Sequence, residues 1–196
     1  MKLSQDNLNI RKERVYFYIM LIFSLIIWVL ITITIVGPII GLLIAFFAWL
    51  GNGLLVAHLK SNCGHVDEKQ LPDLFSAFKD VCEKFNIPMP ELYILQSQGV
   101  LNAYAMRHSG SDFVVLNSDL IEDLDFKGDE IRFLLGHEIG HIKSKHIIKQ
   151  IVLIPASWIP LLAPAYYRAC ETSCDKYGAF SVNNVDGAVR ALAILA

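Results

Sequence analysis

A 45-residue stretch from Val15 to Leu59 contains no Asp, Glu, Lys or Arg. A helix needs about 20 residues, each rising 1.5 Å, to cross the roughly 30 Å hydrocarbon core of a membrane. Gly37-Pro38 divides the stretch into two runs, 15–36 and 39–59, and each run is long enough to span. The first run is too long for a cleaved signal peptide, whose apolar part covers roughly 7–15 residues. We therefore predict a transmembrane hairpin of two helices.

Basic residues lie on both sides of this hairpin, and none lies in its turn. Loops rich in Lys and Arg stay on the cytoplasmic side of a membrane. The pattern predicts an integral protein of the cell membrane, with a cytoplasmic tail at 1–14 and a domain at 60–196 that faces the cytoplasm. The basic residues concerned are Lys2, Arg11, Lys12 and Arg14 before the hairpin, and Lys60 and Lys69 after it.

The remainder of the chain reads as an ordinary globular domain. Residues 61–196 carry 12 basic and 17 acidic side chains, and the whole chain has a net charge of −2. A nucleic-acid-binding protein needs a basic face, so we expect no nucleic-acid partner. The four cysteines are too few for a disulfide-rich secreted scaffold. Cys170 and Cys174 are expected to pack as small core residues, with metal or redox chemistry as the alternative.

The hydrophobic pattern of this domain predicts the α+β class, helical with a small β-sheet. Turn residues at 108–112 favour a hairpin between the two strands that flank them. Asp129 is expected to cap a long helix. The expected elements are helices at 71–85, 118–124 and 129–147, and strands at 91–95, 101–107 and 113–116.

The long helix contains the sequence His137-Glu138-Ile139-Gly140-His141. Residues four apart lie one turn apart on the same helical face, so the two imidazoles can converge on one metal ion. Zinc accepts imidazole nitrogen, and a neighbouring glutamate can take a proton from a water in its open position. The flanking residues are apolar, which favours a buried helix over a surface helix with two solvated histidines. We predict one Zn²⁺ per chain, with Glu138 as the catalytic base.

A catalytic zinc site needs a third protein ligand. His146 is expected to point elsewhere, because it lies about 140° around a continuous helix from His141. Glu171 and Asp175 are four residues apart on an expected helix, so one can bind the metal while the other orients a ligand histidine. Glutamate is the longer side chain, so Glu171 is the expected ligand and Asp175 the expected orienting residue.

Two segments together resemble a known family. The sequence GHEIGHIKSKH at 136–146, followed by Arg168-x-x-Glu171-x-x-Cys174-Asp175, is similar to the HtpX-type membrane zinc metalloproteases. Their relatives include the CAAX prenyl endopeptidases and the mitochondrial Oma-type protease. The resemblance implies a gluzincin-type domain, with His137, His141 and Glu171 as metal ligands and Glu138 as base. Cys174 departs from the family, which usually has alanine at that position.

The sequence Leu101-Asn102-Ala103-Tyr104-Ala105 resembles a strand of the same family. In relatives this strand lies beside the cleft, so Asn102, Ala103 and Tyr104 are expected to pair with an extended substrate. A turn role at the start of the strand is an equally good interpretation of Asn102.

Further polar side chains are expected near the metal. Arg168 lies one turn before Glu171 and is expected to contact a substrate carbonyl or Asp175. An oxyanion would need a hydrogen-bond donor, for which the sequence offers three alternatives. These are His146, Tyr166 and Tyr177.

Residues 151–167, between the two halves of the motif, are mostly apolar and include three prolines. One full crossing here would separate Glu171 from His137 by about 30 Å, and two crossings would need roughly 40 residues. The prolines favour a broken helix. We therefore expect a re-entrant or membrane-interfacial segment, or one folded against the domain.

These features predict a membrane-anchored zinc endopeptidase that acts on misfolded or membrane-associated proteins. Its expected partners are a protein or peptide substrate and membrane lipid. The alternative is a non-catalytic zinc-binding membrane scaffold, which would have no need of Glu138. A processing protease for prenylated tails is disfavoured, because two spans cannot build a large intramembrane chamber.

Overall fold

The uncharged stretch folds into two long helices, α1 (Arg11–Ile33) and α2 (Val36–Asn62). The computed structural model describes residues 8–34, 36–97, 102–122, 128–182 and 185–195. Three predictions reach beyond the described residues: the tail at 1–7, Leu101 at the start of an expected strand, and 123–124 at the end of an expected helix.

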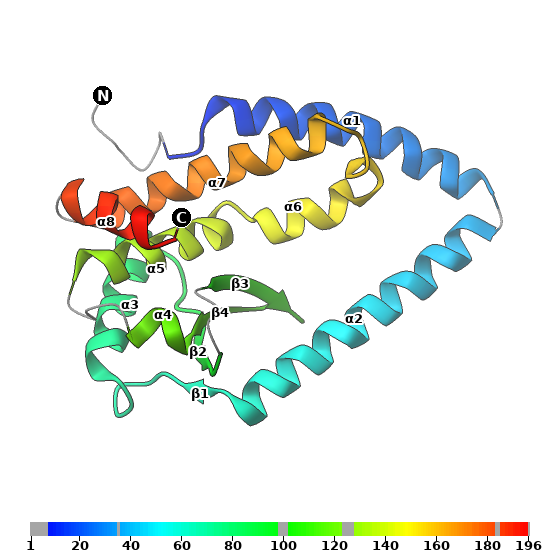
Figure 1. The fold of residues 1–196 in the computed structure, drawn as a ribbon. Helices are drawn as coiled ribbons and strands as arrows, with labels where there is room; N and C mark the ends of the chain where they lie inside the picture. The colour runs from blue at the N-terminus through cyan, green and yellow to red at the C-terminus, as the bar shows by residue number, and fades with distance from the viewer. Residues whose placement is uncertain (1–7, 35, 98–101, 123–127, 183–184, 196) are drawn as a thin grey trace.

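Both helices have the composition and exposure of membrane spans. They contain 23 and 27 residues, and only 11% and 6% of their most apolar windows is buried. The core helix of a soluble protein would be mostly buried, so this exposure favours contact with lipid. Figure 1 shows that the helices diverge from their turn: α1 runs along the domain, and α2 returns to the sheet.

The turn between the helices lies near Thr34, not at Gly37-Pro38 as the sequence predicted. The Thr34 side chain accepts a hydrogen bond from the N–H of Gly37 at 3.1 Å. Gly37 and Pro38 lie in the first turn of α2. Proline is tolerated there because its missing N–H would have no helical partner. An added Cβ at Gly37 would lie 2.3 Å from the carbonyl oxygen of Ile31, so the tight approach requires glycine.

A four-stranded sheet forms one wall of the domain. Its order is β1 (Gly64–His65), β2 (Glu91–Leu95), β4 (Ser111–Asn117) and β3 (Ala103–His108). The predicted hairpin is confirmed, since β3 and β4 pair antiparallel around Ser109 and Gly110, which both have positive φ. β2 and β4 are parallel. The topology leaves β3 at the edge of the sheet.

Two helices bury this sheet on one side. They are α3 (Pro72–Lys84) and α5 (Asp129–Lys143), and the short helix α4 (Ser118–Glu122) follows β4. The N-cap of α5 is Gly128, so Asp129 lies in the first turn and does not cap the helix as predicted. The main core contains Leu74, Phe78 and Val81 of α3, Leu92, Val114 and Leu116 of the sheet, and Ile131, Leu135 and Ile139 of α5.

The long helix expected at 129–147 is two helices. α5 ends at Lys143, Lys145 has a left-handed φ of 55°, and α6 (His146–Leu153) begins in a new direction. The N–H groups of Ser144 and Lys145 bond to the carbonyls of Gly140 and Ile142 and close the last turn.

The last helices are α7 (Leu162–Ser181) and α8 (Val185–Leu195). α7 packs closely on α5 at glycines of both helices. An added Cβ at Gly136 would lie 2.7 Å from Cβ of Ser181, and one at Gly178 would lie 2.8 Å from the carbonyl oxygen of Phe133. At each of these glycines, the helix backbone therefore lies in contact with the neighbouring helix.

Residues 151–167 turn back beside α1 (Figure 1). They comprise the end of α6, a 3₁₀ turn at Ile154–Ala156 and the start of α7. The turn leaves α7 pointing back toward α5, so the two halves of the metal motif meet. The buried residues of this contact are Met20, Leu153, Ala156, Ala163, Tyr166 and Cys170. The large exposed apolar residues are Ile151, Val152, Ile154, Trp158 and Leu161.

The substitution Gly178→Ala is expected to destabilise the domain by about 1–3 kcal/mol, because the new Cβ meets backbone of α5 that cannot rotate away. Denaturant unfolding in detergent measures the change. Gly64→Ala is the matched control, since an added Cβ there meets nothing within 4 Å. Equal stability of the two variants would contradict the packing described.

Candidate metal centre

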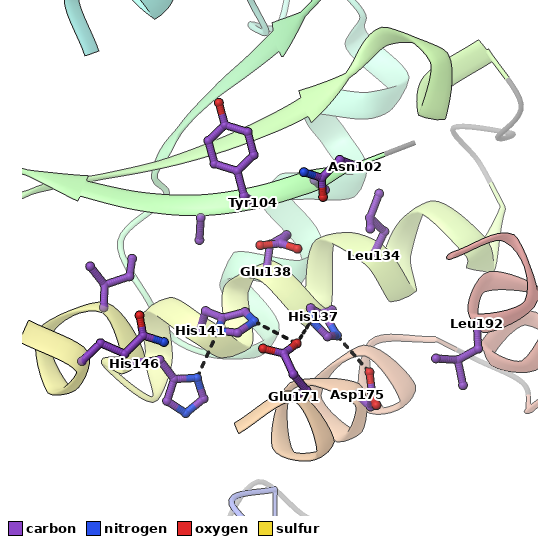
Figure 2. Close-up of a pocket in the computed structure, with 14 residues that line it drawn as sticks. Asn102, Tyr104, Leu134, His137, Glu138, His141, His146, Glu171, Asp175 and Leu192 are labelled. Carbon is purple, nitrogen blue, oxygen red and sulfur yellow. Dashed lines mark hydrogen bonds and ion pairs between the residues drawn. The ribbon is translucent and has the colours of Figure 1, made fainter. Parts of the chain in front are cut away.

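His137 and His141 lie one turn apart on α5, with ring centroids separated by 5.2 Å. Across the interface, Glu171 of α7 points at both rings (Figure 2). Its Oε2 lies 3.3 Å from Nε2 of His137 and 3.7 Å from Nε2 of His141. The glycine contacts between α5 and α7 thus bring two nitrogens and one carboxylate oxygen to a single point.

This donor set fits a zinc ion. Zinc binds imidazole nitrogen at about 2.0–2.1 Å and carboxylate oxygen at about 2.0–2.2 Å, so two tetrahedral ligand atoms lie about 3.3 Å apart. The two distances from Glu171 are close to this value. Three ligands leave a fourth position open, which is the arrangement of catalytic sites.

The charges around the histidines favour a cation. Hydrogen bonds from His137 and His141 hold the pKa of Glu171 well below its usual range, so this carboxylate is anionic. Burial alone would lower the pKa of His137, but hydrogen bonds to Asp175 and Glu171 outweigh it and raise the pKa to about 10. The carboxylates therefore stabilise positive charge here, whether a proton on the ring or a metal ion between the ligands.

Asp175 lies one turn after Glu171 on α7. Its Oδ1 is 3.0 Å from Nδ1 of His137. An Nδ1–H that donates to a carboxylate leaves Nε2 unprotonated and free to bind a metal. The position of Asp175 thus suits the predicted role of orienting the His137 ring.

Glu138 lies between the histidines and the sheet (Figure 2). It is only 5% exposed, and burial raises the pKa of its carboxyl group. The carboxylate accepts a hydrogen bond from the backbone N–H of Ala105 on β3. This position places a weakly acidic carboxyl group against the edge strand, and a carboxylate with a raised pKa is a better proton acceptor near neutral pH.

A cavity of about 580 Å³ lies in front of these groups, between β3 and the helices. Asn102 is exposed at the head of β3, and Ala103 and Ala105 present small side chains. The ring of Tyr104 points away from the metal ligands (Figure 2) and packs toward α2. The remaining lining residues are Leu134, His137, Glu138, His141, His146, Ile147, Gln150, Glu171, Asp175 and Leu192.

Several expected polar contacts are absent from the described part of the chain. Arg168 is exposed on α7 and forms no ion pair with Asp175 or any other described residue. Tyr166 is fully buried against α1, and Tyr177 is buried against Phe85. Neither tyrosine lines the cavity, so the two are poor donors to an oxyanion.

His146 does not point elsewhere as predicted. The break at Lys145 turns its ring back toward α5, where its Nδ1 lies 3.2 Å from Nδ1 of His141. The ring is fully buried, and both of its nitrogens have partners within the protein. The sequence carries no signal for this contact, because the helix breaks at a lysine and not at Gly or Pro.

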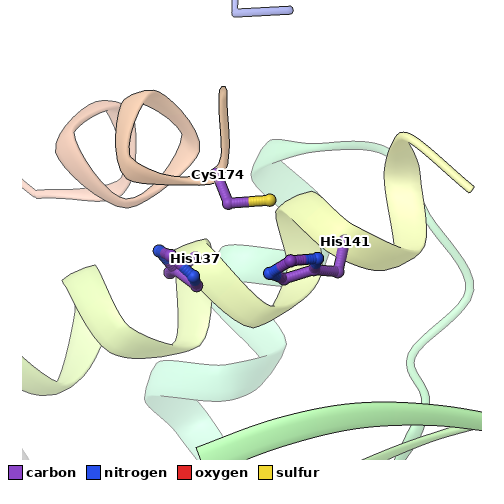
Figure 3. A group of neighbouring side chains, drawn as sticks. All are labelled: His137, His141 and Cys174. Atoms are coloured by element: carbon purple, nitrogen blue, oxygen red, sulfur yellow. The ribbon is translucent and has the colours of Figure 1, made fainter. Parts of the chain in front are cut away.

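Cys174 is also close to both His137 and His141 (Figure 3). Its Sγ and one nitrogen from each ring lie within 4.8 Å of one another. Burial raises the pKa of this thiol well above its usual value. The thiolate is the form that binds metals, so a buried neutral thiol is a weaker third ligand than the anionic Glu171.

Residues 68–162 match Peptidase family M48. The matched segment, just under half of the chain, is similar to an M48 peptidase domain. The match includes His137, Glu138 and His141 and ends before Glu171 and Asp175.

Individual proteins show the same similarity. The chain is 30% identical to a Protease HtpX homolog of Methanothermobacter thermautotrophicus over 167 residues, which are 80% of this chain and 60% of that protein. It is 35% identical to a Protease HtpX homolog of Streptococcus uberis over 96 residues, 48% of this chain and 31% of that protein. The resemblance to the HtpX-type proteins is confirmed.

A plant protein is similar as well. The chain is 32% identical to the Plastoglobule-localized metallopeptidase 48, chloroplastic, of Arabidopsis thaliana over 127 residues, 57% of this chain and 36% of that protein. The chain thus spans between about a third and three fifths of the length of these curated relatives.

The substitution Asp175→Ala is expected to weaken zinc binding about 10- to 100-fold, because His137 loses the carboxylate that contacts its Nδ1. Competition with a chromophoric chelator measures the affinity. Asp186→Ala is the matched control, since Asp186 is an exposed carboxylate in the first turn of α8. Equal zinc affinities in the two variants would show that Asp175 has no such role.

Proposed function

We propose that the chain is a membrane-anchored zinc endopeptidase, with one Zn²⁺ per chain bound by His137, His141 and Glu171. One observation carries this proposal: Glu138 lies buried between the three converging ligands and the edge strand β3. The base, the metal ligands and a surface for an extended peptide thus share one cavity. The M48 match supports a metal-dependent peptidase.

When bound, zinc would lower the pKa of a water molecule and polarise the scissile carbonyl. The side chains of the protein supply the proton transfers. Glu138 takes the proton of the attacking water and delivers it to the nitrogen of the leaving amine. The reaction needs no covalent intermediate with the protein. A purely structural metal site would not need a buried base, which disfavours the scaffold alternative.

The edge of β3 supports binding of the substrate as an added strand. The N–H of Ala105 donates to Glu138, so the backbone at this position faces the cleft and not β4. The methyl side chains of Ala103 and Ala105 leave room beside it. Asn102 lies at the head of this edge, and Tyr104 contributes its backbone while its ring fills the space toward α2. A substrate contact of the exposed Arg168 stays a prediction.

We propose that α1 and α2 anchor the domain in the cell membrane, with the domain in the cytoplasm and misfolded or membrane-associated proteins as substrates. The segment 151–167 packs on α1 through its buried side chains, and its Trp158 is 72% exposed. Tryptophan is favoured at the boundary between lipid and water. The segment therefore suits contact with membrane lipid next to the anchor.

The substitution Glu138→Gln is expected to lower the rate of cleavage of an unfolded protein about 10²- to 10⁴-fold, because the water loses its proton acceptor. Zinc content should stay at one per chain, since Glu138 is not a ligand. The measurement compares detergent-purified wild type and variant with stoichiometric zinc.

Asp186→Ala serves again as the control and should cleave like the wild type. Zinc-loaded wild type that cleaves no unfolded or membrane protein would contradict the peptidase proposal and favour the scaffold. Wild-type activity in Glu138→Gln would contradict the role of Glu138 as base.

A further inference from the structure

A buried chain of hydrogen bonds joins the first turn of α1 to the metal centre. Oε1 of Glu13 lies 3.1 Å from Nε2 of His146, and Nδ1 of His146 lies 3.2 Å from Nδ1 of His141. Glu13 and His146 have no exposed surface. Figure 2 shows the His146 ring beneath His141, on the side away from Glu138.

When His141 binds a metal through Nε2, the hydrogen bonds between His141, His146 and Glu13 permit only one arrangement of protons. His141 then carries its proton on Nδ1 and donates it to Nδ1 of His146. His146 in turn carries its proton on Nε2 and donates it to the Glu13 carboxylate. Each imidazole N–H in this network therefore faces an acceptor. Sγ of Cys174 also lies 3.6 Å from Nδ1 of His146, farther than Nδ1 of His141.

Glu13 is itself held in place by three partners. Besides His146, it accepts hydrogen bonds from Ser173 Oγ at 2.6 Å and from Lys149 Nζ at 3.1 Å. The residues just before it are tied to the same helices: Ser144 Oγ donates to Asn9 Oδ1 at 2.8 Å. Further, the N–H of Ile10 donates to Ser173 Oγ at 3.1 Å. The start of α1 is thus fastened to the α5–α6 break and to α7.

These contacts argue against a second metal site at the same place. Glu13, His146 and Cys170 lie close enough to surround an ion. However, Lys149 and Ser173 already occupy the Glu13 oxygens. Burial also raises the pKa of the Cys170 thiol to about 12, so a thiolate is disfavoured. The cluster is satisfied as a hydrogen-bond network.

His137 and His141 therefore each have a carboxylate as an outer hydrogen-bond partner. His137 reaches the carboxylate of Asp175 directly, at 3.0 Å. His141 reaches the carboxylate of Glu13 through one intervening ring. Outer partners of this kind fix the tautomer and the orientation of a ligand histidine, and their loss costs about 10- to 100-fold in metal affinity.

We infer that Glu13 is a positioning residue of the metal centre: acting through His146, it sets the tautomer and ring orientation of His141. The first turn of α1, in the membrane anchor, then helps to position a ligand of the metal site. This inference rests on the proposed role of His141 as a zinc ligand, and it concerns metal binding and not cleavage.

The test compares wild type, Glu13→Ala, Glu13→Gln and His146→Phe in the full chain in detergent. We expect Glu13→Ala and His146→Phe to lose about 10- to 100-fold in zinc affinity, measured by chelator competition. We also expect both to change the visible absorption bands of the Co²⁺-loaded protein, which report the geometry around the ion. Glu13→Gln keeps an acceptor for His146 and should recover part of the affinity.

Ser144→Ala is the matched control. It removes the hydrogen bond to Asn9 but none of the hydrogen bonds that join Glu13, His146 and His141. It should keep the wild-type affinity and Co²⁺ spectrum, which separates positioning of His141 from general fastening of α1. If Glu13→Ala does not fold, the result for His146→Phe tests the inference, since this substitution replaces a buried ring by one of similar size.

Wild-type zinc affinity and an unchanged Co²⁺ spectrum in folded His146→Phe would overturn the inference. An equal loss in Ser144→Ala would overturn it as well. Failure of the proposed function is distinguishable, because it would appear as zinc-loaded wild type without cleavage and would leave these relative affinities unaffected.

Discussion

The close packing of α5 on α7 is the contact on which the site depends. Gly136 and Gly178 let the two helix backbones approach, and the approach places Glu171 within 3.3–3.7 Å of both histidines. Neither helix carries a complete ligand set. The segment 151–167 makes the approach possible, because it reverses the chain direction beside α1 and returns α7 to the same side of the domain.

Local patterns were sufficient to predict much of the domain. The β3–β4 hairpin follows from turn residues between two apolar runs, and the shared face of His137 and His141 follows from helical geometry alone. The pairing with Glu171 and Asp175 needed a second motif at the same spacing. These features depend on residues a few positions apart, for which periodicity is a reliable guide.

What the sequence could not show depends on distant contacts. The helix breaks at Lys145, where neither Gly nor Pro marks the site, and the break turns His146 toward His141. Ser144, just before the break, bonds to Asn9, which lies 135 positions earlier in the sequence. The early turn at Thr34 is similar, since a hydroxyl that bonds to Gly37 displaces the turn from the Gly-Pro pair. The hydropathy pattern of the sequence does not reveal a side-chain hydrogen bond of this kind.

The hydrogen bonds between the start of α1 and the domain also bear on the order in which the chain folds. Glu13 meets His146 and Ser173 across 133 and 160 positions of sequence, and Ile10 meets Ser173 across 163. During synthesis the first turn of α1 leaves the ribosome before its partner on α7, which follows 160 positions later. Contacts between residues so far apart close late in folding. The hydrogen bonds that hold Glu13 beside His146 are therefore complete only once α7 has been made, so a growing chain that has not reached Ser173 lacks them.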